Sequence, residues 1–252
     1  MEPNNKAEPA RRGGQVLALI PAYNEAARVA AVVSGAHRYL PVLVVDDGSR
    51  DATGEQARRA GAEVLRQEPN QGKGVALKTG FRHALEQDYQ AVITLDADGQ
   101  HDPAEIPKFL EVFREQEVDL VIGARDFGQI PGIRRLSNTI GRLSLSWALN
   151  QEILDNQSGY RLVSRRLMET MLHSQEARFE FEVDMIVESV VRGYRIAWVP
   201  IRTIYAGESS HIQPLRHVYH YFRMVWRAYQ AVRRARRQTS RPDNRKGEHG
   251  IR

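Results

Sequence analysis

Four short apolar runs, separated by stretches of helical character, constrain the fold of this chain more than any other feature. Short continuous apolar runs are typical of strands buried on both faces of a sheet. The runs are Val16–Ile20, Val42–Val45, Ala91–Leu95 and Leu120–Ile122. The stretches predicted to be helices are Glu25–Leu40, Thr53–Ala60, Lys73–Leu85 and a fourth that begins at Asp102-Pro103. This alternation predicts an α/β fold with a mostly parallel sheet flanked by helices.

Local signals support two of these helices. Thr53 and Gln56 have the spacing of a capping box, and Gly61 follows as a stop signal. Asp102 is a candidate cap with Pro103 in the first turn. The chain shows no internal linker, so one large domain is expected.

Polar clusters follow three of the four apolar runs. These clusters are Tyr23-Asn24-Glu25, Asp46-Asp47 and Asp96-Ala97-Asp98. Ligands of open α/β sheets bind outside the carboxyl ends of the strands. The sequence therefore predicts that the three clusters converge at one ligand-binding edge.

Asp96 and Asp98 are candidate metal ligands, because a turn after a buried strand lets both carboxylates reach one hard cation. Gln100 adds a neutral oxygen. The alternative interpretation is a solvated loop in which Asp98-Gly99 makes a turn. Asp46-Asp47-Gly48-Ser49 has a similar alternative in turn formation and helix capping. Gly72-Lys73-Gly74 resembles a phosphate-binding nest with a positive charge beside it.

The order of these clusters resembles the family 2 glycosyltransferases, and most closely the dolichyl- or polyprenyl-phosphate mannosyltransferase branch. The resemblance covers about Val16 to Ser210, and Asp96-Ala97-Asp98-Gly99-Gln100-His101 is its most specific part. It implies a GT-A nucleotide-sugar fold and an inverting transfer of a mannose- or glucose-type sugar from a GDP- or UDP-sugar. It also implies that Mg²⁺ or Mn²⁺, held by Asp96, Asp98 and Gln100, stabilises the departing diphosphate. The residues that it assigns to the nucleotide-sugar are Pro21, Tyr23, Glu25, Asp46, Asp47, Lys73, Asp96 and Ala97.

The resemblance also implies a lipid-phosphate acceptor bound by Arg125, Arg134 and Arg135, since arginine forks suit phosphate oxygens. Asp98, Arg125 and Arg134 are the residues to which it gives a catalytic role. Ordinary surface arginines are the alternative. Gln157–Arg161 resembles an element on the acceptor side. The family's Gly-Glu-Ser-Lys pattern is broken at Gly207–Ser210, where serine replaces lysine.

Two other functions stay open. Transfer to a sugar hydroxyl requires a general base, and Phe179–Asp184 supplies three carboxylates without identifying one. A nucleotide-sugar-binding protein without turnover is the other possibility, although the complete carboxylate set argues against it.

The C-terminal region is basic. The net charge of +5 divides into +9 for residues 216–252 and −4 for the rest. Residues 213–236 are expected to form a basic amphipathic helix that either lies in a membrane interface or packs on a protein surface. Residues 1–14 and 237–252 are expected to be disordered, leaving 15–212 as the catalytic domain. No nucleic-acid-binding motif accompanies the basic tail.

The expected location is the cytoplasm, at the cytoplasmic face of the membrane. The N-terminus has no signal-peptide pattern, and no window reaches the ~18 apolar residues of a membrane span. The sequence has no cysteine, which suits a reducing compartment.

Overall fold

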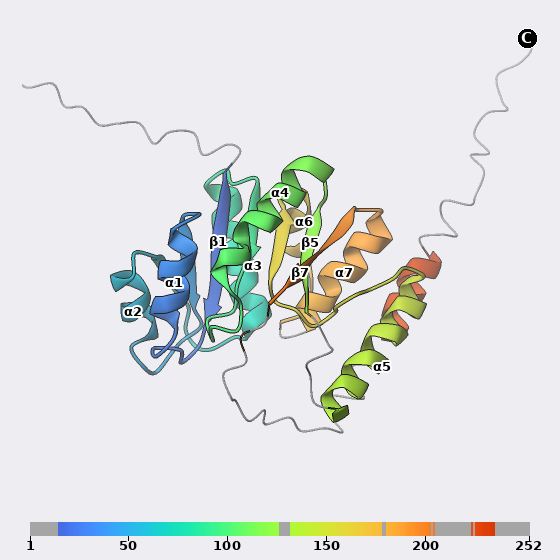
Figure 1. Ribbon diagram of the computed structural model, residues 1–252, viewed down its shortest axis with the longest axis horizontal. Coiled ribbons are helices and arrows are strands. Elements are labelled where there is room, and N and C mark those ends of the chain that lie inside the picture. Colours follow the sequence, from blue (N-terminus) through green and yellow to red (C-terminus); the bar gives the residue numbers. More distant parts are fainter. Residues whose placement is uncertain are drawn as a thin grey trace, which may run out of the picture.

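A seven-stranded sheet with helices on both faces forms the centre of the molecule (Figure 1). The computed structural model describes residues 15–125, 132–177, 180–202, 204, 223 and 225–234, with only the backbone described for 132–138. The strands are β1 Val16–Ala22, β2 Val42–Asp46, β3 Glu63–Arg66, β4 Ala91–Thr94, β5 Leu120–Arg125, β6 Arg161–Ser164 and β7 Ile196–Ile201. Their order is β3-β2-β1-β4-β6-β5-β7. The predicted α/β class is confirmed.

All pairs in the sheet are parallel except those of β6, which runs antiparallel to β4 and β5. β1 lies between β2 and β4, so the strands that precede the three polar clusters are neighbours. Their carboxyl ends therefore meet at one edge of the sheet, as the sequence predicts. β3 and β6 were not predicted, because neither has a continuous apolar run.

The helices cover both faces of the sheet and bury an apolar layer on each. They are α1 Val29–His37, α2 Thr53–Arg59, α3 Lys73–Glu86, α4 Ile106–Gln116, α5 Gly132–Leu149, α6 Arg165–Met171 and α7 Glu180–Arg192, with the 3₁₀ turn η1 Pro103–Glu105 before α4. One core joins the sheet to α3, α5, α6 and α7, and the other joins it to α1, α2 and α4. α3 packs closely on the sheet, because a Cβ placed on Gly80 would collide with the side chain of Leu19 in β1.

Three local predictions were wrong. Thr53 does not cap α2: its hydroxyl accepts a hydrogen bond from the Glu25 amide at 2.7 Å, and Ala52 occupies the N-cap position. α1 begins at Val29 rather than at Glu25, because the hydrogen bond from the Glu25 amide to Thr53 holds Glu25 in the turn before the helix. The stretch Gly128–Ser137 is rich in Gly, Pro and Arg, which predicts a loop, but the chain is helical from Gly132 onward. The Asp102 cap is confirmed by a 2.9 Å hydrogen bond from the Ala104 amide.

The C-terminal helix, residues 225–234, packs on the domain. Val225, Ala228 and Val232 are buried in the same core as α5 and α7. The ring of Tyr229 stacks on that of Trp147 from α5, with centroids 5.1 Å apart and planes 7° apart. Of the two interpretations of this amphipathic helix, packing on the protein surface accounts for these residues. The segments 1–14 and 237–252 lie outside the described residues.

Candidate active site

The loops after β1 and β2 are bonded to each other at the carboxyl edge of the sheet. The Asn24 amide donates to the Ser49 hydroxyl at 2.9 Å, and the Arg50 amide donates to the Asn24 side chain at 2.8 Å. Asn24 takes a left-handed backbone conformation, with φ of 56°, which turns the chain sharply after the strand. These contacts fix the positions of the flanking residues Tyr23 and Glu25.

Asp46 and Asp47 are both buried, and both organise backbone. The Asp46 carboxylate accepts the Ser49 amide at 2.9 Å and pairs with Arg66 at 3.2 Å. The Asp47 carboxylate accepts the amides of Gln71 and Gly72 at 2.9 and 2.8 Å. Asp47 thereby holds the loop that leads into α3. Turn and cap chemistry, the alternative weighed for this motif, is what these two side chains display.

The predicted phosphate nest at Gly72-Lys73-Gly74 has two of its amides occupied. Gly72 donates to Asp47 at 2.8 Å, and Gly74 donates to the carbonyl of Ala177 at 3.0 Å. Gly74 also has no room for a side chain, since a Cβ would lie 2.7 Å from the Ala177 backbone. The group that this motif presents to the sheet edge is therefore the Lys73 side chain.

Lys73, Asp96 and Glu182 form a charged cluster beside the end of β4. The Lys73 ammonium makes ion pairs with Asp96 Oδ1 and, at 2.8 Å, with Glu182 Oε1. Burial alone would lower the pKa of Lys73, but the two carboxylates outweigh it and raise that pKa. Burial opposes ionisation of Asp96, yet Lys73 and His101 together lower its pKa. Lys73 and Asp96 are therefore both charged at neutral pH.

Gly159 lies against the charged ends of the side chains in this cluster. A Cβ at Gly159 would lie 2.8 Å from Asp96 Oδ2, 2.8 Å from Lys73 Nζ and 2.9 Å from Glu182 Oε1. Arg161, two residues further on, is fully buried. Its Nε donates to the Ser158 carbonyl at 2.7 Å, and its Nη1 donates to the Glu182 carbonyl. Burial lowers the pKa of Arg161, although the nearby carboxylates of Glu182 and Asp155 act in the opposite direction.

His101, the last residue of the Asp-Ala-Asp-Gly-Gln-His string, is hydrogen-bonded to the backbone of Asp96. It is 6% exposed, and its Nδ1 accepts the Asp96 amide at 3.0 Å. Burial lowers the pKa of His101. A neutral ring with an unprotonated Nδ1 agrees with both observations. Tyr160 packs on the His101 ring, with centroids 5.0 Å apart.

Asp98 is half-buried in the same turn. Its carboxylate accepts the Gln100 amide at 2.9 Å, and no ion pair to Asp98 occurs within the described part of the chain. Its negative charge acts on Glu25: burial is the main cause that raises the pKa of Glu25, and Asp98 raises it further against the effect of Arg28. Asp98 therefore carries negative charge that the neighbouring side chains leave unbalanced.

Arg125, at the end of β5, is held in a fixed orientation. Asp155 accepts Nε at 2.7 Å and Nη2 at 3.0 Å in a two-point ion pair, and the Asp155 carboxylate is fully buried. The Arg125 charge also contributes to lowering the pKa of Asp96, so the guanidinium belongs to the same electrostatic environment. Arg134 and Arg135 lie in the first turns of α5, and their side chains are outside the described part of the structure.

An open pocket of about 870 Å³ adjoins the loops after β1 and β2. Tyr23, 42% exposed, lines it together with polar groups of both loops. The other lining residues are Gly48, Ser49, Arg50, Asp51, Arg66, Glu68, Pro69 and Asn70. Pro21 and Ala97, which were also predicted to contact the nucleotide, are buried in packed positions.

Four residues of this edge were not predicted as site residues. Asp155, Gly159 and Arg161 come from the segment that ends in β6, and Glu182 comes from the first turn of α7. The signals in the sequence were the Gln157–Arg161 motif and the acidic stretch Phe179–Asp184. Of the carboxylates in that stretch, Glu182 reaches the charged cluster, whereas Asp184 accepts the Ser174 hydroxyl at 2.5 Å.

The parallel sheet with one antiparallel strand, and the carboxylate turn at its edge, define an α/β protein whose candidate site lies at the carboxyl edge of the sheet. It is similar to the crystal structure of glucosyl-3-phosphoglycerate synthase from Mycobacterium tuberculosis in complex with Mn²⁺, UDP-glucose and phosphoglyceric acid. The TM-score is 0.67 at 20% identity, covering 87% of this chain and 80% of that one. This likeness confirms the predicted GT-A fold.

The family model described as "Glycosyl transferase family 2" matches residues 18–172. The chain therefore belongs to the family 2 glycosyltransferases. It is 35% identical over 216 residues to undecaprenyl-phosphate mannosyltransferase of Micrococcus luteus, covering 78% of this chain and 87% of the relative. It is 29% identical over 220 residues to the UDP-N-acetylglucosamine–dolichyl-phosphate N-acetylglucosaminyltransferase of Methanococcus voltae, covering 76% and 86%. The predicted family and enzyme class are confirmed.

Proposed function

We propose that this glycosyltransferase moves a mannose- or glucose-type sugar from a GDP- or UDP-sugar to a polyprenyl or dolichyl phosphate, with inversion at the anomeric carbon. The observation that carries the proposal is the carboxylate turn after β4, where Asp98 stays without an ion-pair partner in the described structure while Asp96 is paired with Lys73. Relatives with 29–35% identity are named for transfer to undecaprenyl or dolichyl phosphate, which supports this acceptor class.

Mg²⁺ or Mn²⁺ fits the donor set at this turn. Asp96 and Asp98 supply hard carboxylate oxygens, and the unbalanced charge of Asp98 raises the pKa of Glu25. No group of three or more His, Cys, Asp or Glu side chains that could hold a metal occurs among the described residues. Mg²⁺ is usually bound by one or two carboxylates together with substrate phosphates. When bound, the cation would neutralise negative charge on the departing diphosphate. Gln100 is the third ligand that we propose.

The nucleoside part of the donor would lie in the pocket beside Tyr23. Glu25 follows the lining residue Tyr23 by two positions, and the charge of Asp98 raises the pKa of Glu25, which relates the pocket to the carboxylate turn. An exposed tyrosine ring offers a stacking surface for a base, and Asp51 and Arg66 offer an acceptor and donors for its edge. Asp46 and Asp47 would act by fixing the loops around this pocket.

The acceptor phosphate would bind at Arg125, with Arg134 and Arg135 of α5 as further cations. Asp155 presets the Arg125 guanidinium, which lowers the entropy lost when a phosphate binds. A phosphate oxygen is already anionic, so the transfer requires no strong general base. Glu182, the acidic side chain of α7 nearest to this chemistry, is paired with Lys73 at 2.8 Å. That pairing favours a lipid phosphate over a sugar hydroxyl.

A lipid acceptor also requires access to a membrane, and we propose that an exposed apolar surface on α5 provides it. Ile140, Leu143 and Trp147 are 49%, 56% and 64% exposed at helical spacing, and we call them the α5 stripe. Trp226 of the C-terminal helix, 57% exposed, continues the apolar surface. Exposed apolar side chains gathered on one surface mark interaction sites.

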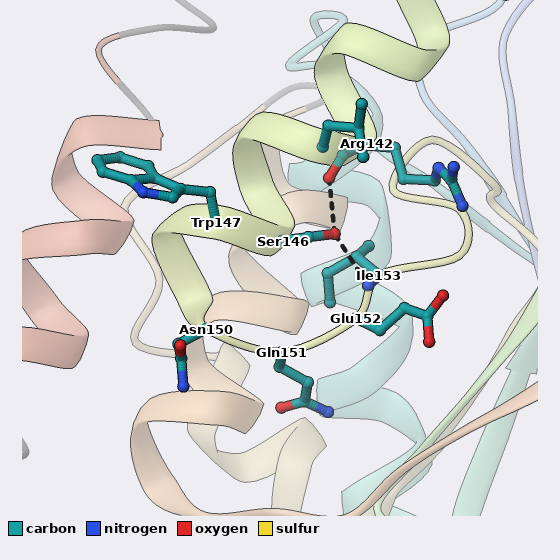
Figure 2. A pocket seen from close by; sticks show the side chains of 8 residues that line it. Arg142, Ser146, Trp147, Asn150, Gln151, Glu152 and Ile153 are labelled. Carbon is teal, nitrogen blue, oxygen red and sulfur yellow. Dashed lines mark hydrogen bonds between the residues drawn. The ribbon is translucent and has the colours of Figure 1, made fainter.

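Figure 2 shows a pocket of about 370 Å³ beside this stripe, at the end of α5. Its lining combines apolar side chains, among them Trp147 and Ile153, with polar ones such as Arg142 and Glu152. A mixed lining of this kind suits the boundary between lipid headgroups and acyl chains. Within the described residues, no helix has the length and hydropathy needed to cross a membrane.

A panel of labelled GDP- and UDP-sugars, incubated with the protein and membrane lipids in the presence of Mg²⁺ or Mn²⁺, tests the proposal. The expected result is label that extracts into organic solvent with one donor, and its loss in Asp98→Asn. Label that appears only in water-soluble glycans, or transfer that survives Asp98→Asn, would contradict the proposal.

A further inference from the structure

The Lys73 ammonium occupies one of the two carboxylates proposed to bind the metal. It is bonded to Asp96 Oδ1 and, on its other side, to Glu182 Oε1 at 2.8 Å. Its side chain is 21% exposed and that of Glu182 is 7% exposed, so solvent screens the contacts only in part. A metal ion at Asp96 would therefore meet a cation already bonded to its ligand.

Apart from Asp98, whose negative charge has no ion-pair partner among the described residues, the charges around this cluster balance without a metal. The cations are Lys73, Arg125 and Arg161, and the carboxylates that face them are Asp96, Asp155 and Glu182. A divalent cation alone would leave this group with excess positive charge. A nucleoside diphosphate brings negative charge with the metal and restores the balance.

We infer that Lys73 is an internal counter-ion of Asp96 in the free enzyme, and that the divalent cation enters only together with the nucleotide diphosphate. The inference rests on the metal site of the proposed function. On binding, the ammonium would leave Asp96 Oδ1 for a diphosphate oxygen, keeping one positive charge beside the leaving group. A lysine suits this exchange, since its charge is a compact point on a flexible stem with three donors.

The chain offers a matched control on the same helix. Lys78 also lies in α3, but its ammonium donates to the Ser174 carbonyl at 3.1 Å and lies over the Phe181 ring. Lys78→Met removes one positive charge from the helix without removing a partner of Asp96. Lys73→Met removes the same charge at the proposed metal ligand.

The test is Mn²⁺ binding, followed by the electron paramagnetic resonance signal of free Mn²⁺. Wild type and Lys78→Met should bind Mn²⁺ weakly alone and tightly with UDP or GDP. Lys73→Met should bind Mn²⁺ without nucleotide about tenfold more tightly than wild type, because the competing cation is gone. Asp96→Asn added to Lys73→Met should abolish that gain.

Two outcomes would overturn the inference in distinguishable ways. If Lys73→Met and wild type bind Mn²⁺ equally without nucleotide, while both bind it tightly with nucleotide, Lys73 is no counter-ion and the proposed function stands. If wild type fails to bind Mn²⁺ with either nucleotide, the proposed metal role fails and the inference fails with it.

A measurement on the wild-type chain keeps the inference testable should Lys73→Met fail to fold. The chain has five lysines, so the Lys73 ammonium signal in ¹H–¹⁵N spectra can be assigned through substitutions of the other four. That signal should stay unchanged with Mg²⁺ alone and shift with Mg²⁺ plus UDP or GDP. An equal shift with Mg²⁺ alone would contradict ordered entry.

Discussion

Gly159 contacts three charged side chains of the site at once, and its lack of a side chain sets the geometry of the cluster. A methyl group there would approach the ends of Asp96, Lys73 and Glu182 to within 2.8–2.9 Å. These are side-chain ends rather than backbone, so they can move apart while the fold persists. The cost of the substitution should therefore appear in catalysis.

Gly159→Ala should lower kcat/KM by about 100-fold, since small misplacements of reacting groups cost that much. Unfolding by urea should show a modest change in stability. Gly193→Ala is the contrasting control: its φ of 68° strains an alanine, while the added Cβ meets no neighbour within 4 Å. That variant should lose about 1 kcal/mol of stability and keep its transfer rate. Equal activity losses in both variants would contradict this assignment.

The two-point contact of Arg125 with Asp155 leads to a second prediction at this scale. Lysine keeps the charge at position 125 but cannot reproduce the paired Nε and Nη2 contacts. Arg125→Lys should lower kcat/KM for the lipid phosphate by about 10- to 100-fold. The affinity for UDP or GDP with Mn²⁺ should be unchanged. A loss of nucleotide affinity as large as the loss in kcat/KM would place Arg125 on the donor side instead.

At the scale of elements, Asp119 joins three segments far from the site. Its carboxylate accepts the Ser164 hydroxyl at 3.1 Å, Arg166 Nη2 at 2.6 Å and the Arg195 amide at 3.1 Å. Burial would raise the pKa of Asp119, but these hydrogen bonds outweigh it and lower that pKa. Asp119 thus connects the start of β5 with α6 and with the segment that enters β7.

Asp119→Asn should lower the free energy of unfolding at pH 7 by about 1–3 kcal/mol, because charged hydrogen bonds in a buried position are lost. A lowered folded-state pKa stabilises the protein above the unfolded-state pKa, and this contribution disappears as the pH falls through the folded-state value. The difference between wild type and Asp119→Asn should therefore shrink on going from pH 7 to pH 3. Urea unfolding at both pH values measures it. Asp88→Asn, in an exposed ion pair with Arg165, should show no measurable change.

Among the strands and helix caps, the sequence predicts some correctly and misses others. The four apolar runs predict β1, β2, β4 and β5, because strands buried on both faces need continuous apolar residues. β6 escapes this reasoning: Arg161 begins it, and its burial depends on carbonyl partners at Ser158 and Glu182 that the sequence cannot bring together. Thr53 fails as a cap for a similar reason, since its hydroxyl serves the Glu25 amide 28 residues earlier.

For the candidate site, the carboxylate turn is recognisable from its sequence alone, whereas its partners are not. Asp96 and Asp98 follow a predicted strand in a specific string of residues. Glu182 reaches Asp96 through Lys73 only because α7 packs beside α3, which is a tertiary contact. The resemblance indicated which residues to consider, and the fold shows which of them act by holding loops, as Asp46 and Asp47 do.

At the scale of the whole molecule, the α5 stripe and Trp226 of the C-terminal helix form the surface that we propose meets a lipid bilayer. In Figure 1, α5 lies on the outer side of α7, and the C-terminal helix lies beside one end of α5. Arg227 is exposed on that helix, next to Trp226, and Arg223, also exposed, lies shortly before it in the chain. Basic and aromatic side chains together favour an anionic membrane surface.

Replacing Ile140 and Leu143 by serine should weaken sedimentation with anionic vesicles by about tenfold or more, since two large apolar side chains lose their contact with lipid. Binding of wild type should fall with added salt, owing to the basic residues nearby. Tyr39→Ser is the matched control, because Tyr39 is a 40%-exposed aromatic residue just after α1. Unchanged vesicle binding in the double variant would exclude the α5 stripe as the membrane contact.

The central claim is that the sugar acceptor is a lipid phosphate, and a single comparison of acceptors tests it most directly. Wild-type protein, with Mn²⁺ and the donor found active in the panel, is given either a short polyprenyl phosphate or the same polyprenol without phosphate. The account predicts a labelled, organic-extractable glycosyl phosphate with the first acceptor and no labelled lipid with the second. Equal labelling of the polyprenol, or labelling of an added sugar hydroxyl in preference to the phosphate, would contradict it.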